Sequence, residues 1–385
     1  MKDNVTIIGA SSAGLFAAYL LARGGLPVRL YDQGETLGPP PRTLIVTRRI
    51  NQVLGFVPAE AILNRVHHIE LLSRNASARV SLKEPDLVLE RESLLRLLAA
   101  KARGEGAEIE LGHRFLGFEG DGNGLVLSVK NRRRDRVERV RTRFLIGADG
   151  PFSNVARAAQ QAGRGTVAIL QARVVLPPWA DADTVKVWFD REATRFFYWL
   201  IPESSRSAAV GLISEDERDA SEKLRRFLKD HRLEAIEYQA AQVSTHALGF
   251  RPWRRIGGSD VLLVGDAAGQ VKMTTVGGVV TGLRGARAAA RAILRGTAYG
   301  RELRALKREL DLHWWIRRVL DRFADADYDR LLDLLNGRAK GILETHSRDE
   351  MARALWGLLL AQPQWLLLGA RALLRPHNLV GGLRS

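Results

Sequence analysis

The stretch "VTIIGASSAGLFAAYLLARGGLPVRLYD", residues 5–32, decides the fold. It predicts a strand at Val5–Ile8, a glycine turn, an amphipathic helix over Ala13–Arg23 and a second strand at Val28–Tyr31. A βαβ unit with glycines in its turn and an acid after its second strand is the fingerprint of dinucleotide binding. The sequence therefore predicts a Rossmann-like α/β sheet; an ordinary glycine turn in a parallel sheet is the alternative.

The glycine turn supplies candidate phosphate contacts. Gly9 and Gly14 fit the first and third glycines of the fingerprint, and Ser11 occupies the second position. The hydroxyls of Ser11 and Ser12 can donate to a phosphate beside the helix amides, and Asp32 stands where an acid binds a ribose diol. The predicted phosphate turn comprises Gly9, Ala10, Ser11, Ser12, Ala13 and Gly14.

Two later strands end in the same way. The predicted strand Phe144–Ile146 follows a β-meander and runs into "GADG", which contains Asp149. The apolar run "VLLV" at 261–264 runs into Gly265 and Asp266. Open α/β sheets bind ligands beyond the carboxyl ends of their strands, so both acids are candidate ligand contacts.

Composition excludes several kinds of chemistry. The chain has 385 residues, 46% of them hydrophobic, which is enough for two or three packed units. It has no cysteine, so disulfides, thiolate metal sites and cysteine nucleophiles are excluded, and we expect no metal site. A net charge of +16 indicates either an anionic partner or solvated charged faces. The first residues read as a strand rather than a secretory signal, so we expect a cytoplasmic protein.

Four motifs in order resemble the FAD-dependent oxidoreductases of the glutathione-reductase and hydroxybenzoate-hydroxylase type. They are "GASSAGL", Arg91 at the head of a helix, "GADGPFSNVAR" and "GDAAGQVKMTTVGG". Within that group the chain is most similar to the geranylgeranyl reductase family, over roughly residues 1–300. The resemblance implies that FAD is the cofactor.

The resemblance also implies a role for each matching residue. Gly9 to Gly14 would hold the FAD pyrophosphate, Asp32 the adenosine ribose and Arg91 the ribityl-phosphate side. The remaining expected cofactor contacts are Leu116 near adenine, Asp149, Gly265, Asp266 at the ribityl chain, and Gly277, Gly278 and Val279 at the isoalloxazine.

The sequence departs from the family pattern in two places. Met273 stands where a proline normally follows "VK", which makes the turn less rigid. The loop "GETLGPPPRTLIVTRR", residues 34–49, lacks the cysteine-glycine pair that many geranylgeranyl reductases carry near the flavin. A role for that thiol therefore cannot be transferred to this chain.

Residues 166–250 alternate strand-like runs with a charged helical stretch over 215–239, and predict an antiparallel sheet over the flavin. "FYWLIP", residues 197–202, is similar to the family's substrate face, although alternating aromatics are also typical of a plain core. The expected domains are 1–165 and 251–299 for FAD (with 36–85 contributing to the substrate side), 166–250 for the substrate, and a helical region over 300–385.

The resemblance implies an enzyme that reduces carbon-carbon double bonds of a prenyl chain. The catalytic candidates are Phe197 and Trp199 beside the alkene, and Tyr198 and Lys272 as proton donors. A flavin-dependent halogenase or aromatic monooxygenase is the alternative; a halogenase needs a lysine deep in the substrate side, for which Lys186 is the candidate. A flavoprotein that only passes electrons is a third reading.

The expected partners are a hydrophobic or prenyl-lipid substrate and an external electron donor, nicotinamide or ferredoxin, but no nucleic acid. Residues 354–370 carry no charge but are interrupted at Gln362, Pro363 and Gln364, too short and broken for a spanning helix. This segment either packs against the FAD domain or lies on the inner face of an anionic membrane. The second reading places Trp356 and Trp365 at headgroup depth, with arginines at the rim: Arg353, Arg371 and Arg375.

Overall fold

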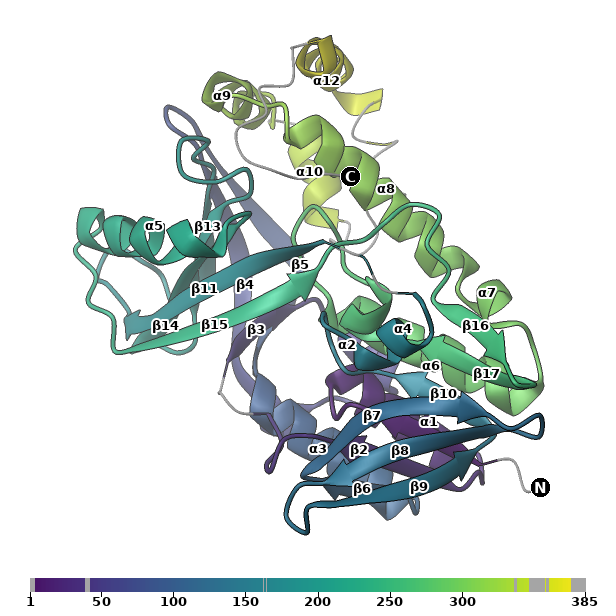
Figure 1. Cartoon of the computed structure of the whole chain (residues 1–385). Coiled ribbons are helices and arrows are strands. Elements are labelled where there is room, and N and C mark those ends of the chain that lie inside the picture. The colour runs from purple at the N-terminus through teal and green to yellow at the C-terminus, as the bar shows by residue number, and fades with distance from the viewer. Residues whose placement is uncertain are drawn as a thin grey trace.

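The computed structural model describes residues 4–38, 42–161, 163, 165–335, 338–345, 357 and 360–374. Figure 1 shows two sheet-based parts, one above the other, with helices running along one side of both. The predicted class, a Rossmann-like α/β fold with an antiparallel sheet and C-terminal helices, is confirmed.

The first part is built on a six-stranded sheet in the order β16-β17-β10-β1-β2-β6. All neighbours pair in parallel except the edge strand β16, which is antiparallel to β17. The strands are β1 (Val5–Ile8), β2 (Val28–Asp32), β6 (Glu108–Leu111), β10 (Phe144–Gly147), β16 (Trp253–Ile256) and β17 (Ser259–Leu263). The predicted βαβ unit is therefore present at the centre of the sheet.

Both faces of this sheet are covered, which explains its uninterrupted apolar strands. Ile7 packs with helices on one face, whereas Ile8 packs with a three-stranded sheet on the other. The helices are α1 (Ser12–Arg23), α3 (Arg91–Gly104) and α6 (Val279–Arg295). The small sheet comprises β7 (His113–Gly120), β8 (Leu125–Asn131) and β9 (Arg136–Thr142), and lies in front of the parallel strands in Figure 1.

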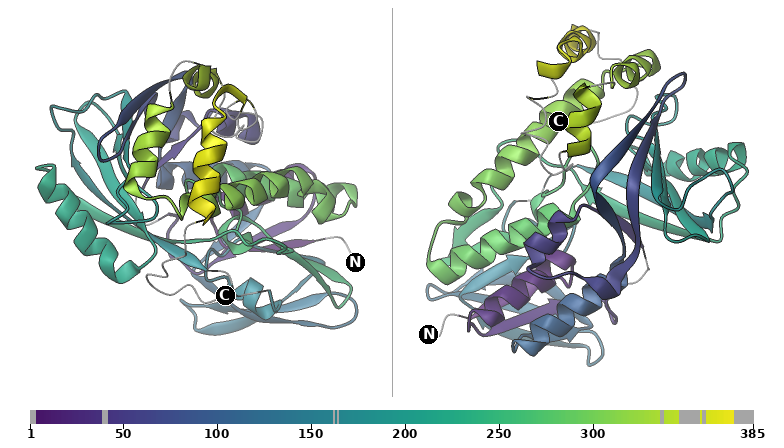
Figure 2. Two further views of the ribbon diagram at one scale, coloured as in Figure 1. Left: turned by 90° about the horizontal axis from the view of Figure 1, so that it is seen from above. Right: turned by 180° about the vertical axis from the view of Figure 1, so that it is seen from behind.

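The second part is an eight-stranded sheet in the order β15-β11-β14-β13-β12-β4-β5-β3. Its strands are β3 (Thr43–Val46), β4 (Ile62–Leu72), β5 (Ser77–Glu90), β11 (Thr166–Val175), β12 (Thr184–Trp188), β13 (Tyr198–Pro202), β14 (Ser207–Ser214) and β15 (Glu237–Ser244). The long strands β4 and β5 connect the two parts, as the view from behind in Figure 2 shows.

One face of this sheet is covered by α5 (Glu217–Asp230). The helical stretch expected over 215–239 was too long, because the chain turns after Asp230 and residues from Glu237 pair with β11 as an edge strand. The charged residues continue from α5 into β15, because an exposed edge strand also carries charged side chains. The end of the helix could therefore not be predicted from the charge pattern.

The remaining helices and turns connect the two sheets and form the C-terminal region. They are α2 (Arg49–Leu54), η1 (Ala59–Ala61), α4 (Asn154–Ala158), η2 (Gly265–Ala268), α7 (Tyr299–Glu302), α8 (Arg304–Leu320), α9 (Asp325–Asp333), α10 (Arg338–Thr345) and α12 (Gln364–Leu374). Helices α9 and α10 contact β5, and α12 contacts α8 and α9.

The C-terminal helices bear on the membrane reading of the sequence. Trp365 is half-buried and packs against Ala339, Ile342 and Leu343 of α10. Trp356, Arg353 and Arg375 lie outside the described residues. Within the described part of the chain, no helix combines the length and the apolar character that crossing a membrane requires.

Candidate functional site

The carboxyl ends of neighbouring strands meet at one edge of the parallel sheet. Ile8 of β1 is in register with Gly147 of β10, which is in register with Leu263 of β17. The residues that follow these strands, and Asp32 at the end of β2, therefore gather at one edge. The structure thus brings together the segments that the sequence analysis singled out separately.

The glycine turn after β1 has no room for side chains at its two glycines. A Cβ on Gly14 would lie 2.1 Å from the carbonyl oxygen of Gly9 and 2.9 Å from the Cβ of Ala148. A Cβ on Gly9 would lie 2.4 Å from the carbonyl oxygen of Ala148, and Gly9 has a φ of +107°. The turn is therefore pressed against the end of β10, as the first and third fingerprint glycines require.

Polar groups hold the turn in place. The Ser11 hydroxyl accepts a hydrogen bond from the Gly14 N–H (3.2 Å) and caps α1, which leaves its own hydrogen available to a ligand. Oδ2 of Asp32 accepts from the Ala10 N–H at 2.6 Å, and Oδ1 accepts from the Gly34 N–H at 2.7 Å. The carboxylate is thus fixed beside the turn, where the predicted ribose contact belongs.

Asp266 lies beside the first residues of α6 in space. It belongs to η2 directly after β17, and a Cβ on Gly278 would lie 3.1 Å from its Oδ1. Gly278 is the N-cap of α6, which begins at Val279, so the free amides of this helix end lie next to the carboxylate. The predicted contacts at Asp266, Gly278 and Val279 therefore form one local site.

Two arginines converge on the same region. Burial lowers the pKa of Arg91, while Glu90, Asp266 and Asp32 act in the opposite direction; its Nη1 donates to the Gly38 carbonyl at 2.8 Å. Burial and, to a smaller extent, the charge of Arg91 lower the pKa of Arg42 to about 10, although Asp266 acts in the opposite direction. No described carboxylate forms a salt bridge with Arg42.

This pair is the observation that tests the fit of FAD to the site. Two guanidinium groups withdrawn from water beside one another repel, and are costly unless an anion lies between or beside them. A pyrophosphate supplies that charge, and the glycine turn and the start of α6 supply free backbone N–H donors. The residues present therefore fit FAD. The sequence analysis missed Arg42, which belongs to no local motif.

Two predicted cofactor contacts have other evident roles in the fold. The Asp149 carboxylate accepts hydrogen bonds from the Ser153 hydroxyl (2.5 Å) and from the N–H groups of Asn154 and Val155 (2.7 and 3.1 Å), which fixes the start of α4. Leu116 is half exposed at a bulge where β7 slips in register against β8, so its backbone stands outside the ladder.

The face of the large sheet opposite α5 is apolar and packs on the loop before α6. Trp199, Ile201 and Val185 form one buried cluster with Val271 and Val276 of that loop. Phe197 packs against this cluster, with its ring 6.2 Å from that of Trp199 and tilted by 67°. Phe197 and Trp199 therefore both face the loop before α6.

Tyr198 lies on the other face of β13, where its ring stacks on Phe227 of α5 (4.2 Å, 13°). Burial raises its pKa, and its hydroxyl donates to the Lys223 carbonyl at 3.3 Å. Its role as a proton donor was therefore wrong, because successive residues of a strand point to opposite faces. Lys272, in contrast, is buried in the loop before α6, where its backbone N–H donates to the Gly277 carbonyl (3.1 Å).

Three further residues support the site and were missed. Gly211 leaves room for Trp199, because a Cβ there would lie 2.5 Å from the indole Cζ2. Gln270 accepts from the Gly265 N–H at 2.7 Å and donates to the Tyr299 hydroxyl at 3.2 Å, which ties the loop to α7. Nδ1 of His313, on α8, lies 2.7 Å from the Thr274 hydroxyl. These roles depend on contacts with residues that are distant in the sequence, so no sequence motif predicts them.

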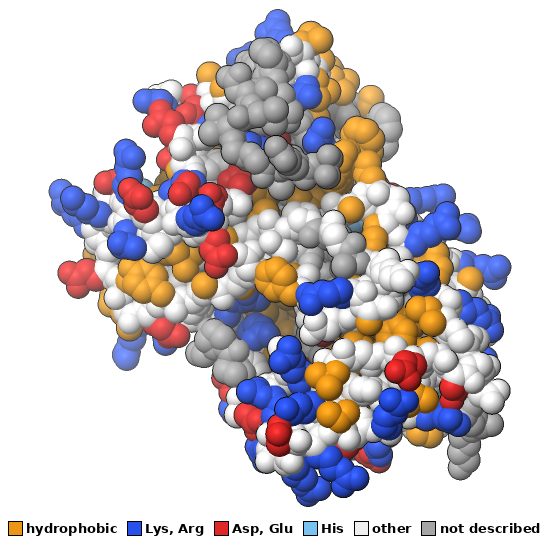
Figure 3. Space-filling model, viewed as in Figure 1, with side chains coloured by type: hydrophobic (Ala, Val, Ile, Leu, Met, Phe, Trp, Pro, Cys, Tyr) orange, Lys and Arg blue, Asp and Glu red, His pale blue; other side chains and the backbone are white. Residues whose placement is uncertain are grey.

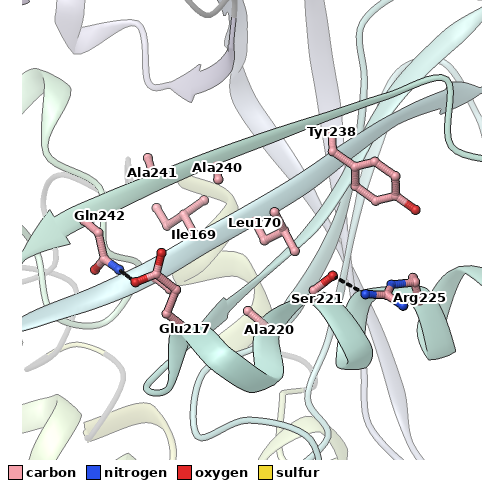
Figure 4. Close-up of a pocket in the computed structure, with 11 residues that line it drawn as sticks. Ile169, Leu170, Glu217, Ala220, Ser221, Arg225, Tyr238, Ala240, Ala241 and Gln242 are labelled. Carbon is pink, nitrogen blue, oxygen red and sulfur yellow. Dashed lines mark hydrogen bonds between the residues drawn. The ribbon is translucent and has the colours of Figure 1, made fainter.

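A surface cavity lies away from these residues. It measures about 580 Å³ and lies between α5 and the strands β11 and β15. Figure 4 shows the Glu217–Gln242 and Arg225–Ser221 hydrogen bonds at its sides. Its lining contains none of the predicted site residues, so we do not assign it to the cofactor or to the aromatic face.

The fold and the site together define the class of protein. Residues 2–315 match the family described as "FAD binding domain", which is most of the chain. With a fitting site at the edge of the parallel sheet, the protein is an FAD-dependent oxidoreductase.

Two comparisons narrow the class. The chain is 30% identical to digeranylgeranylglycerophospholipid reductase 2 of Methanothermobacter thermautotrophicus, over 88% of this chain and 93% of that protein. Its fold matches a geranylgeranyl bacteriochlorophyll reductase-like protein of Thermoplasma acidophilum, with a TM-score of 0.82 and 19% identity over 96% of this chain and 98% of that one. The chain belongs to the FAD-dependent geranylgeranyl reductase family.

A third comparison concerns the alternative function. A flavin-dependent brominase shares the fold at a TM-score of 0.67 and 17% identity, over 96% of this chain and 99% of that one. At this identity the likeness concerns the fold alone. The choice between prenyl reduction and halogenation therefore depends on the individual residues of the site.

Proposed function

We propose that this FAD-dependent oxidoreductase reduces carbon-carbon double bonds in a prenyl chain of the geranylgeranyl type. The observation that carries the proposal is the apolar sheet face formed around Phe197 and Trp199, packed directly on the loop before α6. Such a face suits a flat, uncharged hydrocarbon. The reductase name of the relative with 30% identity supports the same substrate class.

In this proposal the chain holds FAD at the edge of the parallel sheet. The turn from Gly9 to Gly14 and the arginines Arg42 and Arg91 hold the pyrophosphate, Asp32 the ribose, and Asp266 the ribityl chain. The amides of Gly278 and Val279 face the ring, where the positive end of α6 favours negative charge. When bound and reduced, FAD supplies the hydride that an alkene accepts.

The aromatic residues position the substrate and exclude water. The Trp199 side chain is buried and its indole N–H has no hydrogen-bond partner among the described residues. An orphaned buried donor costs about 1–3 kcal/mol unless a ligand accepts from it. A prenyl chain has no such acceptor, so we propose that this N–H faces the bound FAD, while the ring faces of Trp199 and Phe197 contact the prenyl chain. Lys272 is the remaining proposed proton donor.

The position of Lys186 argues against the halogenase alternative. Val185 and Val187, on either side of it, face the loop before α6, so Lys186 points to the opposite face of β12. There its Nζ is paired with Glu70. The one strand lysine that a halogenase reading relied on therefore lies away from the proposed substrate face.

Two partners complete the proposal. Reduction requires an external electron donor, for which a nicotinamide and a ferredoxin are the candidates. Exposed leucines on α12 and a net charge of +16 favour contact with an anionic membrane surface on the cytoplasmic side: Leu366, Leu367, Leu373 and Leu374. Figure 3 shows hydrophobic side chains around α12 and Lys and Arg side chains spread over the same view.

The test uses chemically reduced enzyme without oxygen. Geranylgeranyl lipid or geranylgeranyl diphosphate should oxidise the bound FAD, and mass spectrometry should find a product heavier by two hydrogens for each double bond reduced. Reduced enzyme without a prenyl compound is the control. Flavin that stays reduced with every prenyl compound, together with halogenation of an aromatic compound in air and bromide, would show that the proposal is wrong.

A further inference from the structure

A basic recess lies along α6, apart from the proposed cofactor contacts. Arg284, Arg287 and Arg291 are three and four residues apart and therefore share one face of the helix. Helix α2 packs on this face and contributes Arg49. These four arginines, which we call the arginine recess, line a cavity of about 280 Å³.

The two glutamates found at the arginine recess among the described residues do not neutralise it. Arg284 donates to Oε2 of Glu309 at 2.6 Å, and Arg49 lies 3.9 Å from the same oxygen, so two cations share one buried carboxylate. Glu302 also lines the cavity, where its Oε1 accepts from the Thr297 hydroxyl at 3.0 Å. Among the described residues that line the cavity, together with Glu309, four arginines and two glutamates leave a net positive charge.

Arg287 and Arg291 carry that excess. Nη2 of Arg287 donates to the backbone carbonyls of Gln52 (3.0 Å) and Val53, at the end of α2, and not to a carboxylate. Burial lowers the pKa of Arg287, and the charge of Arg291 lowers it further. Arg291 is exposed, and no described carboxylate forms a salt bridge with it. Like charges held together in a recess favour a bound anion.

We propose that the arginine recess binds the phosphate or diphosphate end of a small molecule. Guanidinium groups match phosphate oxygens in geometry as well as in charge, which favours phosphate over a simple halide. A cavity of about 280 Å³ is small for a whole nucleotide or lipid, so the remainder of the ligand lies outside it. At about 1.5 Å per residue, Arg287 lies about 12 Å along α6 from Val279, at the proposed flavin ring.

This phosphate chemistry has two sources, the headgroup of a prenyl substrate and the phosphates of a nicotinamide nucleotide. Both would bring a reactant to the site from the α6 side. The binding site itself does not rest on the proposed reduction of prenyl chains, whereas the choice between the sources does.

The first experiment measures binding of inorganic pyrophosphate by calorimetry to the full chain saturated with FAD, so that the cofactor site is filled. We expect binding that weakens with added salt. Arg291→Gln should weaken it about tenfold, and Arg287→Gln with Arg291→Gln about a hundredfold, since each removes a charged hydrogen-bond donor. Arg134→Gln with Arg136→Gln, at the exposed turn after β8 and the first residue of β9, is the control with the same change in charge and should bind as the wild type does.

Arg291→Gln by itself keeps the test decisive if loss of Arg287 loosens α2. No binding to the wild-type protein, or equal binding to wild type and Arg291→Gln, would overturn the proposal. This titration requires no turnover, so its outcome is independent of whether prenyl compounds are reduced.

The second experiment identifies the source by comparing the KM values of Arg291→Gln with those of the wild type. A higher KM for geranylgeranyl diphosphate, but not for geranylgeraniol, with dithionite as reductant assigns the recess to the substrate headgroup. A higher KM for NADPH in flavin reduction assigns it to the nucleotide. If neither KM changes, the recess does not serve a phosphate ester of this enzyme, which would overturn the assignment.

Discussion

Replacing Gly211 by alanine should displace Trp199 without touching the cofactor site. Gly211 lies opposite Trp199 in the β13–β14 pairing. An added Cβ would lie 2.5 Å from the indole Cζ2, 2.6 Å from the Cβ of Gln171 and 2.6 Å from the carbonyl oxygen of Leu170. The carbonyl and the Gln171 Cβ both belong to β11, so the backbone at position 211 has to shift away from β11, and the indole on the other side has to move as well.

The size of the effect follows from these distances. Carbon atoms normally approach to about 3.5–4.0 Å, so the indole must retreat by about 1 Å. Overpacking of this kind destabilises a protein by about 1–3 kcal/mol. A shift of about 1 Å in a group that positions a reactant can slow a reaction by about 10²-fold. FAD affinity should change little, because the three atoms nearest to the added Cβ belong to Trp199, Gln171 and Leu170, none of which is a residue that we propose to bind the pyrophosphate or the ribose.

The assay follows oxidation of reduced flavin by geranylgeranyl lipid in the absence of oxygen, together with flavin content and the melting temperature. We expect a slow reaction, full flavin content and a lower melting temperature. Gly104→Ala is the control, because an added Cβ at this exposed helix end meets nothing within 4 Å. A wild-type reaction rate in a folded but destabilised Gly211→Ala protein would refute the role of Trp199.

Three further predictions concern other parts of the molecule. Arg42→Gln should weaken FAD binding about tenfold to a hundredfold in a fluorescence titration, and an unchanged affinity would remove Arg42 from the site. Lys186→Met should lower the melting temperature through loss of the Glu70 pair but leave prenyl reduction unchanged, whereas an abolished reaction would return Lys186 to the active site. Leu366→Ser with Leu367→Ser should reduce flotation with anionic liposomes, and equal flotation would show that α12 does not contact lipid.

The strand ends and the glycine turn were predictable because they follow local rules. A buried parallel strand needs a run of apolar residues, and a tight turn beside another strand needs a glycine, so β1, α1, β2 and β10 could be predicted nearly to the residue. Asp32 and Asp266 were found because they directly follow such strands.

The remaining features depend on contacts between distant segments. Alternation in "FYWLIP" separates Tyr198 from its neighbours Phe197 and Trp199, but it does not say which set faces α5, and so Tyr198 was misplaced. Arg42 acquires its role from Arg91 and Asp266, which are far away in the sequence. A pattern within a short stretch of sequence cannot predict that these three charged side chains lie close together.

The order of strands in the parallel sheet has a consequence for the synthesis of the chain. Strand β1 at residue 5 is paired with β10, which begins at residue 144, and β10 is paired with β17, which begins at residue 259. At about 5–20 residues per second, a ribosome needs roughly 13–50 s to proceed from β1 to β17. Until then the apolar edge of β10 has no partner and Asp266 has not been made. The full set of proposed FAD contacts therefore exists only after the chain has been synthesised past Val279, about two thirds or more of its 385 residues.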